Sequence, residues 1–80
     1  MLENLKSAKK VIGVKQSAKA LENGMVKLVI MARDAEQKVT SGIVELCSVN
    51  SVEIVYEDSM KQLGKMCGID VGAAVVCLLK

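Results

Sequence analysis

Two almost continuous apolar runs constrain the fold of this chain more than any other feature of its sequence. They are VKLVIMA at residues 26–32 and AAVVCLL at residues 73–79. The first is rich in β-branched residues and predicts a buried strand, and the second predicts a final apolar strand. A third segment, VEIVY at residues 52–56, alternates as a strand does, and Val11–Ile12 form a brief apolar step near the N-terminus.

Segments with helical periodicity lie between these strands. Residues 12–24 place apolar side chains on one helix face and end at Asn23–Gly24, where glycine can adopt the left-handed conformation that follows a last turn. Asp34 stands three residues before Gln37, which is the spacing of a capping box. It predicts the start of an amphipathic helix that ends near Asn50.

Two shorter helices are also expected. Ser59 and Gln62 have a second capping-box spacing, and the helix that they open is expected to end at Gly68. A short first helix is suggested by Leu2, Leu5 and Ala8 or Lys9. Because helices alternate with strands, the chain is predicted to be an α/β sandwich with a central sheet covered on both sides.

The composition fits one small domain over residues 1–80. The core must be aliphatic, because 51% of the residues are hydrophobic while Phe and Trp are absent and Tyr56 is the only aromatic residue. No apolar run approaches the roughly 20 residues of a membrane span. Residues 1–10 contain no apolar stretch like that of a signal peptide, so we expect a cytoplasmic protein without a membrane partner.

The reactive side chains argue against an enzyme. The chain has no His, and its glycine-rich segment GKMCGIDVG matches neither phosphate-loop nor dinucleotide spacing. The three cysteines Cys47, Cys67 and Cys77 are widely spaced, which disfavours a zinc site. We therefore expect reduced cysteines in the core, with a regulatory thiol as the alternative, and neither a metal nor a cofactor.

The net charge of +2 conceals an uneven distribution. Lysines concentrate in residues 1–20 and 61–80, whereas acidic residues prevail in residues 21–60. If the two ends of the chain meet in space, they form one basic face; otherwise the charges only solvate the surface. A basic face would favour a nucleic-acid partner.

The helix predicted over residues 12–24 begins in an unusual way. Gly13 occupies the capping position, Lys15 and Gln16 fill the first turn, and Lys19 follows one turn later. A helix start carries partial positive charge and usually attracts Asp or Glu. A lysine can simply be tolerated there, at a cost of about 0.3–1 kcal/mol, or it can meet an anionic partner.

Composition narrows the kind of nucleic acid. Modules that bind single strands stack bases on aromatic side chains, which this chain almost lacks. Proteins that read B-form DNA usually do so with helix-turn-helix motifs or continuous helices, and not with this α/β order. Structured RNA remains, bound through its phosphates and through base edges where the duplex is distorted.

Four motifs occur in order along the chain. They are G-x-N/K-E/Q-x-x-K (Gly13, Lys15, Gln16, Lys19), A-x-D (Ala32, Asp34), S-x-x-x-L-G-K (Ser59, Leu63, Gly64, Lys65) and CGIDVGAAVV at residues 67–76. Together they resemble the kink-turn RNA-binding ribosomal protein family of the archaeal L7Ae-like proteins, and within it the bacterial YbxF-like branch. The resemblance covers nearly all of the chain. It implies a three-layer α-β-α sandwich with a small mixed sheet of about four strands.

The resemblance also implies a function and a site. A kink-turn is an RNA element in which a short bulge and tandem sheared G·A pairs bend a duplex sharply. Lys15 and Lys19 would then meet phosphates or guanine acceptors, and Gln16 would read the purine edges of a G·A pair. The implied RNA-binding residues are Gly13, Lys15, Gln16, Lys19, Arg33, Lys61, Ile69, Asp70, Val71 and Gly72.

Within this set the roles differ. Gly13 and Gly72 would let the backbone approach the RNA, and Asp70 would accept a base amino group or a backbone N–H. Ile69 and Val71 either pack on bulged nucleotides or belong to the core. Arg33 and Lys61 would contact phosphates. The pair Lys15–Gln16 replaces the Asn–Glu of archaeal members and resembles the bacterial branch.

The expected partner is structured RNA with a kink-turn, with the ribosome or other ribonucleoprotein components as further partners, and the protein is expected to be a monomer. An alternative is a protein-interaction module that uses the loop of residues 69–73 within a ribonucleoprotein assembly.

Overall fold

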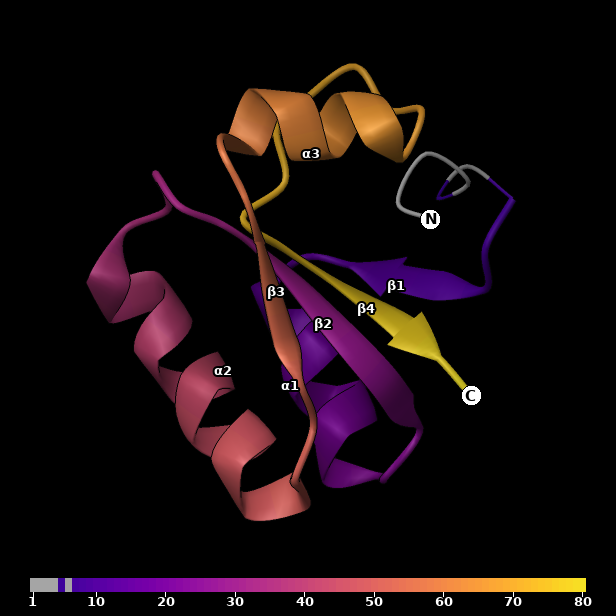
Figure 1. Cartoon of the computed structure of the whole chain (residues 1–80), viewed down its shortest axis with the longest axis vertical. Helices are drawn as coiled ribbons and strands as arrows, with labels where there is room; N and C mark the ends of the chain where they lie inside the picture. The colour runs from indigo at the N-terminus through magenta and orange to yellow at the C-terminus, as the bar shows by residue number, and fades with distance from the viewer. Residues whose placement is uncertain (1–4, 6) are drawn as a thin grey trace.

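A four-stranded mixed sheet forms the middle of the molecule in the computed structural model, which describes Leu5 and residues 7–80 (Figure 1). The elements are β1 (Lys10–Ile12), α1 (Val14–Glu22), β2 (Val26–Ala32), α2 (Gln37–Asn50), β3 (Ile54–Glu57), α3 (Met60–Met66) and β4 (Val75–Leu79). The strand order is β1-β4-β2-β3. β2 and β3 are parallel, and β4 is antiparallel to both of its neighbours, β1 and β2.

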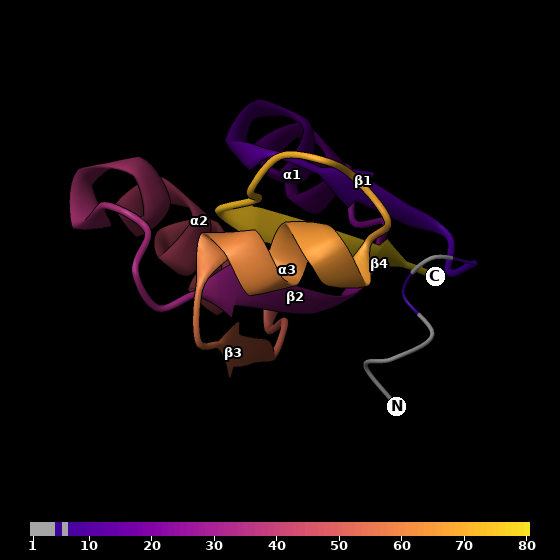
Figure 2. The ribbon, with the colours of Figure 1, turned by 90° about the horizontal axis from the view of Figure 1, so that it is seen from above.

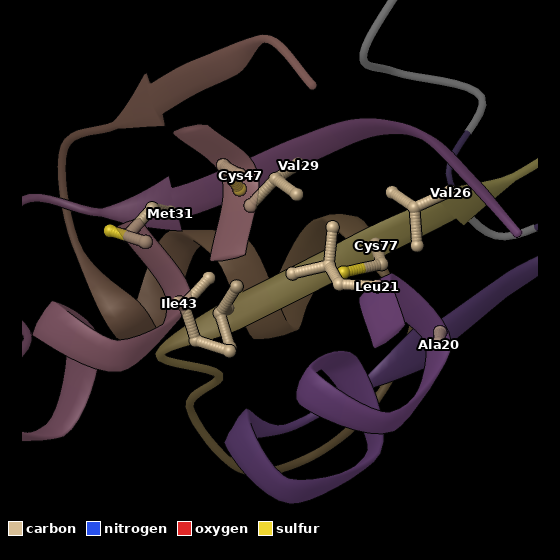
Figure 3. Packing of buried hydrophobic residues seen from close by; sticks show 9 residues of the cluster. Ala20, Leu21, Val26, Val29, Met31, Ile43, Cys47 and Cys77 are labelled. Atoms are coloured by element: carbon tan, nitrogen blue, oxygen red, sulfur yellow. The ribbon is translucent and has the colours of Figure 1, made fainter. Parts of the chain in front are cut away.

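The central position of β2 explains why its sequence is almost wholly apolar. Val29 and Met31 point into one hydrophobic cluster, together with side chains of α1 and α2 (Figure 3). Ile30 and Ala32 belong to a second cluster on the other face, with Leu63 of α3. Both faces of the strand are therefore covered, and the prediction of a buried strand is confirmed.

The layers follow from these two clusters. α1 and α2 cover one face of the sheet through side chains that include Leu21 and Ile43. α3 and Leu5 pack against the other face, because Leu63 and Leu5 share a cluster with Ile30, Ala32 and Val76. The predicted three-layer α-β-α sandwich with four strands is confirmed.

The three cysteines are free and buried in this core. Burial raises the pKa of the Cys47 thiol to about 11, and the neighbouring Cys77 thiol acts in the same direction. Burial also raises the pKa of the Cys67 thiol, and it raises that of the Cys77 thiol against the opposing effect of a hydrogen bond with Ser17. The thiols are therefore protonated at neutral pH, as the prediction of core cysteines requires.

Two of the predicted helix starts differ from the structure. The first helix expected over residues 2–9 falls largely outside the described residues, and residues 7–9 lead into β1 as a turn and a bend. The capping box of Asp34 and Gln37 is wrong, because α2 begins at Gln37 with Glu36 as its N-cap residue and no side-chain capping bond. Ser59, by contrast, caps α3 as predicted, since its side chain accepts a hydrogen bond from the Gln62 N–H.

Within the described part of the chain, the longest helix has 14 residues, and no helix meets the length and apolarity that crossing a membrane requires.

Candidate nucleic-acid interface

The candidate residues gather where three strands end and the fourth begins. β1 and β2 both run antiparallel to β4, and β3 runs parallel to β2, so the ends of β1, β2 and β3 meet the start of β4. We call this region the loop end; it consists of residues 13–16, 33–36, 58–61 and 68–74. Its segments 33–36 and 58–61 lie at the upper left of Figure 1, and the loop that follows α3 crosses the top. The topology thus brings together four segments that are distant in sequence.

Backbone hydrogen bonds hold these segments in place. The Gly13 N–H donates to the Val75 carbonyl at 2.9 Å, which fixes the start of α1 beside the start of β4. The Ala32 N–H donates to the Ala74 carbonyl at 2.9 Å, and the Arg33 N–H donates to the Glu57 carbonyl at 2.8 Å. The loop end is therefore a continuous part of the hydrogen-bonded sheet.

The start of α1 has the composition of an anion site. Gly13 is the N-cap residue and has φ +104°, a conformation that side chains rarely allow, so the fold itself requires glycine here. No side chain caps the helix, and its first turn contains no acidic residue. The first hydrogen bond of the helix runs from the Ser17 N–H to the Gly13 carbonyl at 3.0 Å. The amides before Ser17 therefore have no acceptor within the helix.

The side chains of α1 divide into two faces. Ser17, Ala20 and Leu21 are buried against the sheet and α2, whereas Lys15, Gln16 and Lys19 are exposed. Neither Lys15 nor Lys19 forms an ion pair with another described residue. Gln16 and Lys19 also border a shallow hollow of about 260 Å³. The three predicted site residues of this helix are thus placed together on its open side.

The start of α3 is built differently. Asp34 Oδ1 accepts a hydrogen bond from the Met60 N–H at 2.8 Å, and Ser59 Oγ accepts one from the Gln62 N–H at 3.0 Å. Asp34, predicted to open α2, therefore caps α3 instead, 26 residues away. Lys61 follows in the first turn and is exposed at the loop end.

The segment between α3 and β4 passes between α3 and α1 when seen from above (Figure 2). The Ala73 N–H donates to the Met60 carbonyl at 3.0 Å, and a Cβ at Gly72 would lie 3.1 Å from the Met60 Cβ. A Cβ at Gly64 would overlap the Val71 carbonyl oxygen. Two glycines therefore allow this loop to lie directly on α3.

The two apolar residues of this loop, Ile69 and Val71, lie in different surroundings. Ile69 is half-buried and packs against the core cluster that contains Leu63 and Cys67. Val71 has 69% of its surface exposed, and Asp70 is exposed beside it. The alternatives left open for these residues thus resolve differently: Ile69 contributes to the core, and Val71 projects from it.

Arg33 lies at the end of β2 but on the far side of the loop end from α1. Its guanidinium carbon is 5.5 Å from the centre of the Tyr56 ring, and its Nε is 3.7 Å from Asp58 Oδ1. The sequence alone gives Tyr56 no partner, because the pairing of Met31 with Tyr56 in the parallel strands is what brings the ring near Arg33.

The two ends of the chain do meet, since β1 pairs with β4. The Lys80 N–H, however, donates to the Met25 carbonyl at 2.9 Å, at the opposite end of the sheet from the loop end. The basic surface at the loop end therefore comes from α1, Arg33 and the start of α3, without the C-terminal lysine.

Comparison with known proteins places the chain in a family. The model of the ribosomal protein L7Ae/L30e/S12e/Gadd45 family matches residues 2–80. An RNA-binding protein of Halalkalibacterium halodurans is 54% identical over 70 residues, which are 88% of this chain and 85% of that protein. The RNA-binding protein YbxF of Geobacillus stearothermophilus is 41% identical over 76 residues, 95% of this chain and 93% of that protein.

A solved structure gives the same fold. The Giardia lamblia 15.5kD RNA binding protein superposes with a TM-score of 0.89 at 26% identity, over 99% of this chain and 68% of the other. The fold is that of a small α-β-α RNA-binding protein of ribosomal type. The chain belongs to the ribosomal protein L7Ae/L30e/S12e/Gadd45 family. Membership confirms the family predicted from the four motifs, and with it the prediction that the chain is not an enzyme.

Proposed function

We propose that this protein binds RNA through the loop end and that its target is a kink-turn. The observation that carries the proposal is the start of α1, where a glycine N-cap and amides without a side-chain cap adjoin Lys15 and Lys19. Both lysines are exposed, and neither forms an ion pair with any other residue that the structure describes. An anion at this position would offset the unfavourable placement of Lys15. The printed names of the relatives, which describe RNA-binding proteins, support the RNA part of the proposal.

Each exposed residue of α1 has a role that its chemistry suits. The α1 amides and Lys15 bind phosphate or guanine acceptors. Gln16 donates to and accepts from the purine edges of a sheared G·A pair, and Lys19, one turn further along the same open side, reaches guanine O6 and N7 or a phosphate.

The loop of residues 68–74 supplies the second contact. The hydrogen bond from Gly13 to Val75 sets this loop beside the start of α1, so one RNA can touch both. Val71, with 69% of its surface exposed, packs on the bulged nucleotides, while Asp70 accepts a hydrogen bond from a base. Lys61 binds the flanking backbone, whereas Ile69 supports the loop from the core side.

Binding at two points selects the bent form of the RNA. An extended duplex would reach only one of them, so the protein shifts the RNA population toward the kink. We propose a monomer of one domain in the cytoplasm that acts on ribosomal or other structured RNA.

A titration over a series of salt concentrations tests the proposal with three RNAs: a kink-turn, the same duplex without its bulge, and the kink-turn with its G·A pairs made Watson–Crick. We expect tight binding to the first RNA alone, and the salt slope counts the phosphates that are engaged. Equal and steeply salt-dependent binding to all three would show a generic basic surface and overturn the kink-turn assignment.

The variant Gln16→Ala refines the same experiment. If Gln16 reads a G·A pair, the variant weakens binding to the kink-turn more than binding to the duplex without G·A pairs. An equal loss on both RNAs would show that Gln16 only positions the protein on the backbone.

A further inference from the structure

A second hollow opens on the other side of the loop end from α1. It has a volume of about 330 Å³ and lies between α2 and the ends of β2 and β3. Arg33 and Tyr56 form one part of its wall, and Gln37, Thr40 and Val44 of α2 form another. Volumes of this size are at the lower end of those that bind small organic ligands, so the hollow has room for one small group.

The side chains of this hollow have the chemistry of a base-stacking site. Tyr56 is the only aromatic residue of the chain, yet 45% of its surface is exposed on an edge strand. The Arg33 guanidinium lies over its ring, with 5.5 Å between the guanidinium carbon and the ring centre. Aromatic rings and guanidinium planes are the surfaces on which unpaired RNA bases stack.

The polar groups around Tyr56 and Arg33 can bind the base edge and the phosphate of a nucleotide. Gln37 is exposed at the first position of α2, where its amide can bond the edge of a base. Arg33 pairs with Asp58 at 3.7 Å, but the Asp58 side chain is 92% exposed. Such a pair contributes little free energy, so a phosphate can replace Asp58 as the partner of Arg33.

The position of the hollow connects it to the proposed RNA surface. It lies at the same end of the sheet as the start of α1, and the strand order places β3 three strand spacings from β1, about 14 Å. RNA seated on α1 and on the loop of residues 68–74 can therefore extend a flanking strand to it.

We propose that this hollow, named here the Tyr56–Arg33 pocket, binds one unpaired nucleotide of a single strand that flanks the bound RNA element. The base stacks on the pair of side chains, and its phosphate takes the place of Asp58. The inference rests on the proposed RNA-binding function and extends it, because it assigns a contact outside the kink-turn itself.

The test compares a kink-turn RNA with closed ends and the same RNA carrying a four-nucleotide single-stranded extension on either strand. We expect the extension on one strand to tighten binding about tenfold, which is within the range of one base stacked on an aromatic side chain. The gain disappears when the contacting nucleotide of that extension is made abasic. The emission of Tyr56, which no other aromatic residue obscures, changes only with the extended RNA.

Three variants test whether the gain in affinity from the extension depends on Tyr56 and Arg33. Tyr56→Leu loses the gain, Tyr56→Phe keeps it, and Asp58→Asn increases it a few-fold because Arg33 is released for the phosphate. Val49→Ala is the matched control, since Val49 is 76% exposed near the far end of α2. Urea unfolding of each variant separates a lost contact from a lost fold.

The outcomes distinguish the pocket from the proposed function. Tight kink-turn binding with no effect of either extension overturns the pocket alone. An extension-dependent gain without preference for the kink-turn overturns the proposed function and leaves the pocket. Equal loss by Tyr56→Leu on closed and extended RNA, or self-association that this variant abolishes, overturns the pocket as a nucleotide site.

Discussion

The starts of α1 and α3 lie at the same end of the sheet, but side chains cap only the start of α3. The first amides of α3 are bonded to the side chains of Asp34 and Ser59. The start of α1 has no side-chain cap and no acidic residue, and Lys15 stands in its first turn. An uncompensated helix start costs stability, and α2 also begins without a side-chain cap. The proposal that α1 meets an anion therefore rests on the missing cap together with the exposed Lys15, Gln16 and Lys19 on one side of the helix.

The surroundings of the two helices support this distinction. The carbonyl of Met60, the first residue of α3, also accepts the Ala73 N–H, so the start of α3 holds the loop that precedes β4. α1 is held from its inner side by Ser17, Ala20 and Leu21, which leaves its outer side unconstrained. Substitutions in α3 are therefore expected to change stability, and substitutions on the outer side of α1 are expected to change binding.

The largest effect is expected for Gly64→Ala in α3. The added Cβ would overlap the Val71 carbonyl oxygen, so either the helix or the loop must move. We expect a net loss of about 2–3 kcal/mol in the free energy of unfolding, measured in urea. The control is Gly42→Ala in α2, where a Cβ meets nothing within 4 Å and should stabilise the protein by up to about 1 kcal/mol.

If Gly64→Ala were as stable as the natural protein, the loop would not be held by α3, and the contrast between the two helices would lose its structural basis.

The next effect concerns RNA binding. Lys19→Ala is expected to weaken binding to a kink-turn RNA by about 1–3 kcal/mol, because it removes a charged contact to a base edge or phosphate. The free energy of unfolding should change by less than about 0.5 kcal/mol, since the side chain is exposed. Lys27→Ala, an exposed lysine near the start of β2, is the control for a general loss of charge. An unchanged dissociation constant at fixed salt would contradict the assignment of Lys19.

The sequence predicted the layers better than it predicted the connections between them. The apolar run of β2 and the periodicity of α1 depend on burial alone, and burial leaves a local pattern. Asp34 shows where this reasoning stops: its spacing to Gln37 indicated a local capping box, yet its carboxylate bonds to Met60. A bond between residues 26 positions apart leaves no local signal.

The candidate site shows the same limit. The unusual start of α1 is a local feature, so its residues could be named as candidates from the sequence. Ile69 and Val71 could not be told apart, because which of two neighbouring apolar residues faces the core depends on how the loop lies on Gly64. The Tyr56–Arg33 pocket was missed entirely, since it depends on the register of β2 against β3.

A smaller effect on stability tests the cap of α3. Asp34→Ala removes the acceptor of the Met60 N–H and is expected to lower the free energy of unfolding by about 1 kcal/mol. Asp34→Asn keeps an acceptor oxygen and should lose only part of this. Urea unfolding measures both variants, with RNA affinity measured alongside. A loss of affinity without a loss of stability would show that Asp34 belongs to the binding surface and not to the fold.

The smallest effect is expected for Lys15→Glu, which should change stability and RNA affinity in opposite directions. Lys15→Glu places a carboxylate at the uncapped start of α1, so the free energy of unfolding should rise by about 0.5 kcal/mol while RNA binding weakens. Lys61→Glu makes the same change at α3, where Asp34 and Ser59 already bond the amides, and should gain less. Urea unfolding at low ionic strength and RNA titration measure both variants. If Lys15→Glu does not stabilise the protein, the lysine causes no strain at this helix start, and no anion is needed to explain its presence.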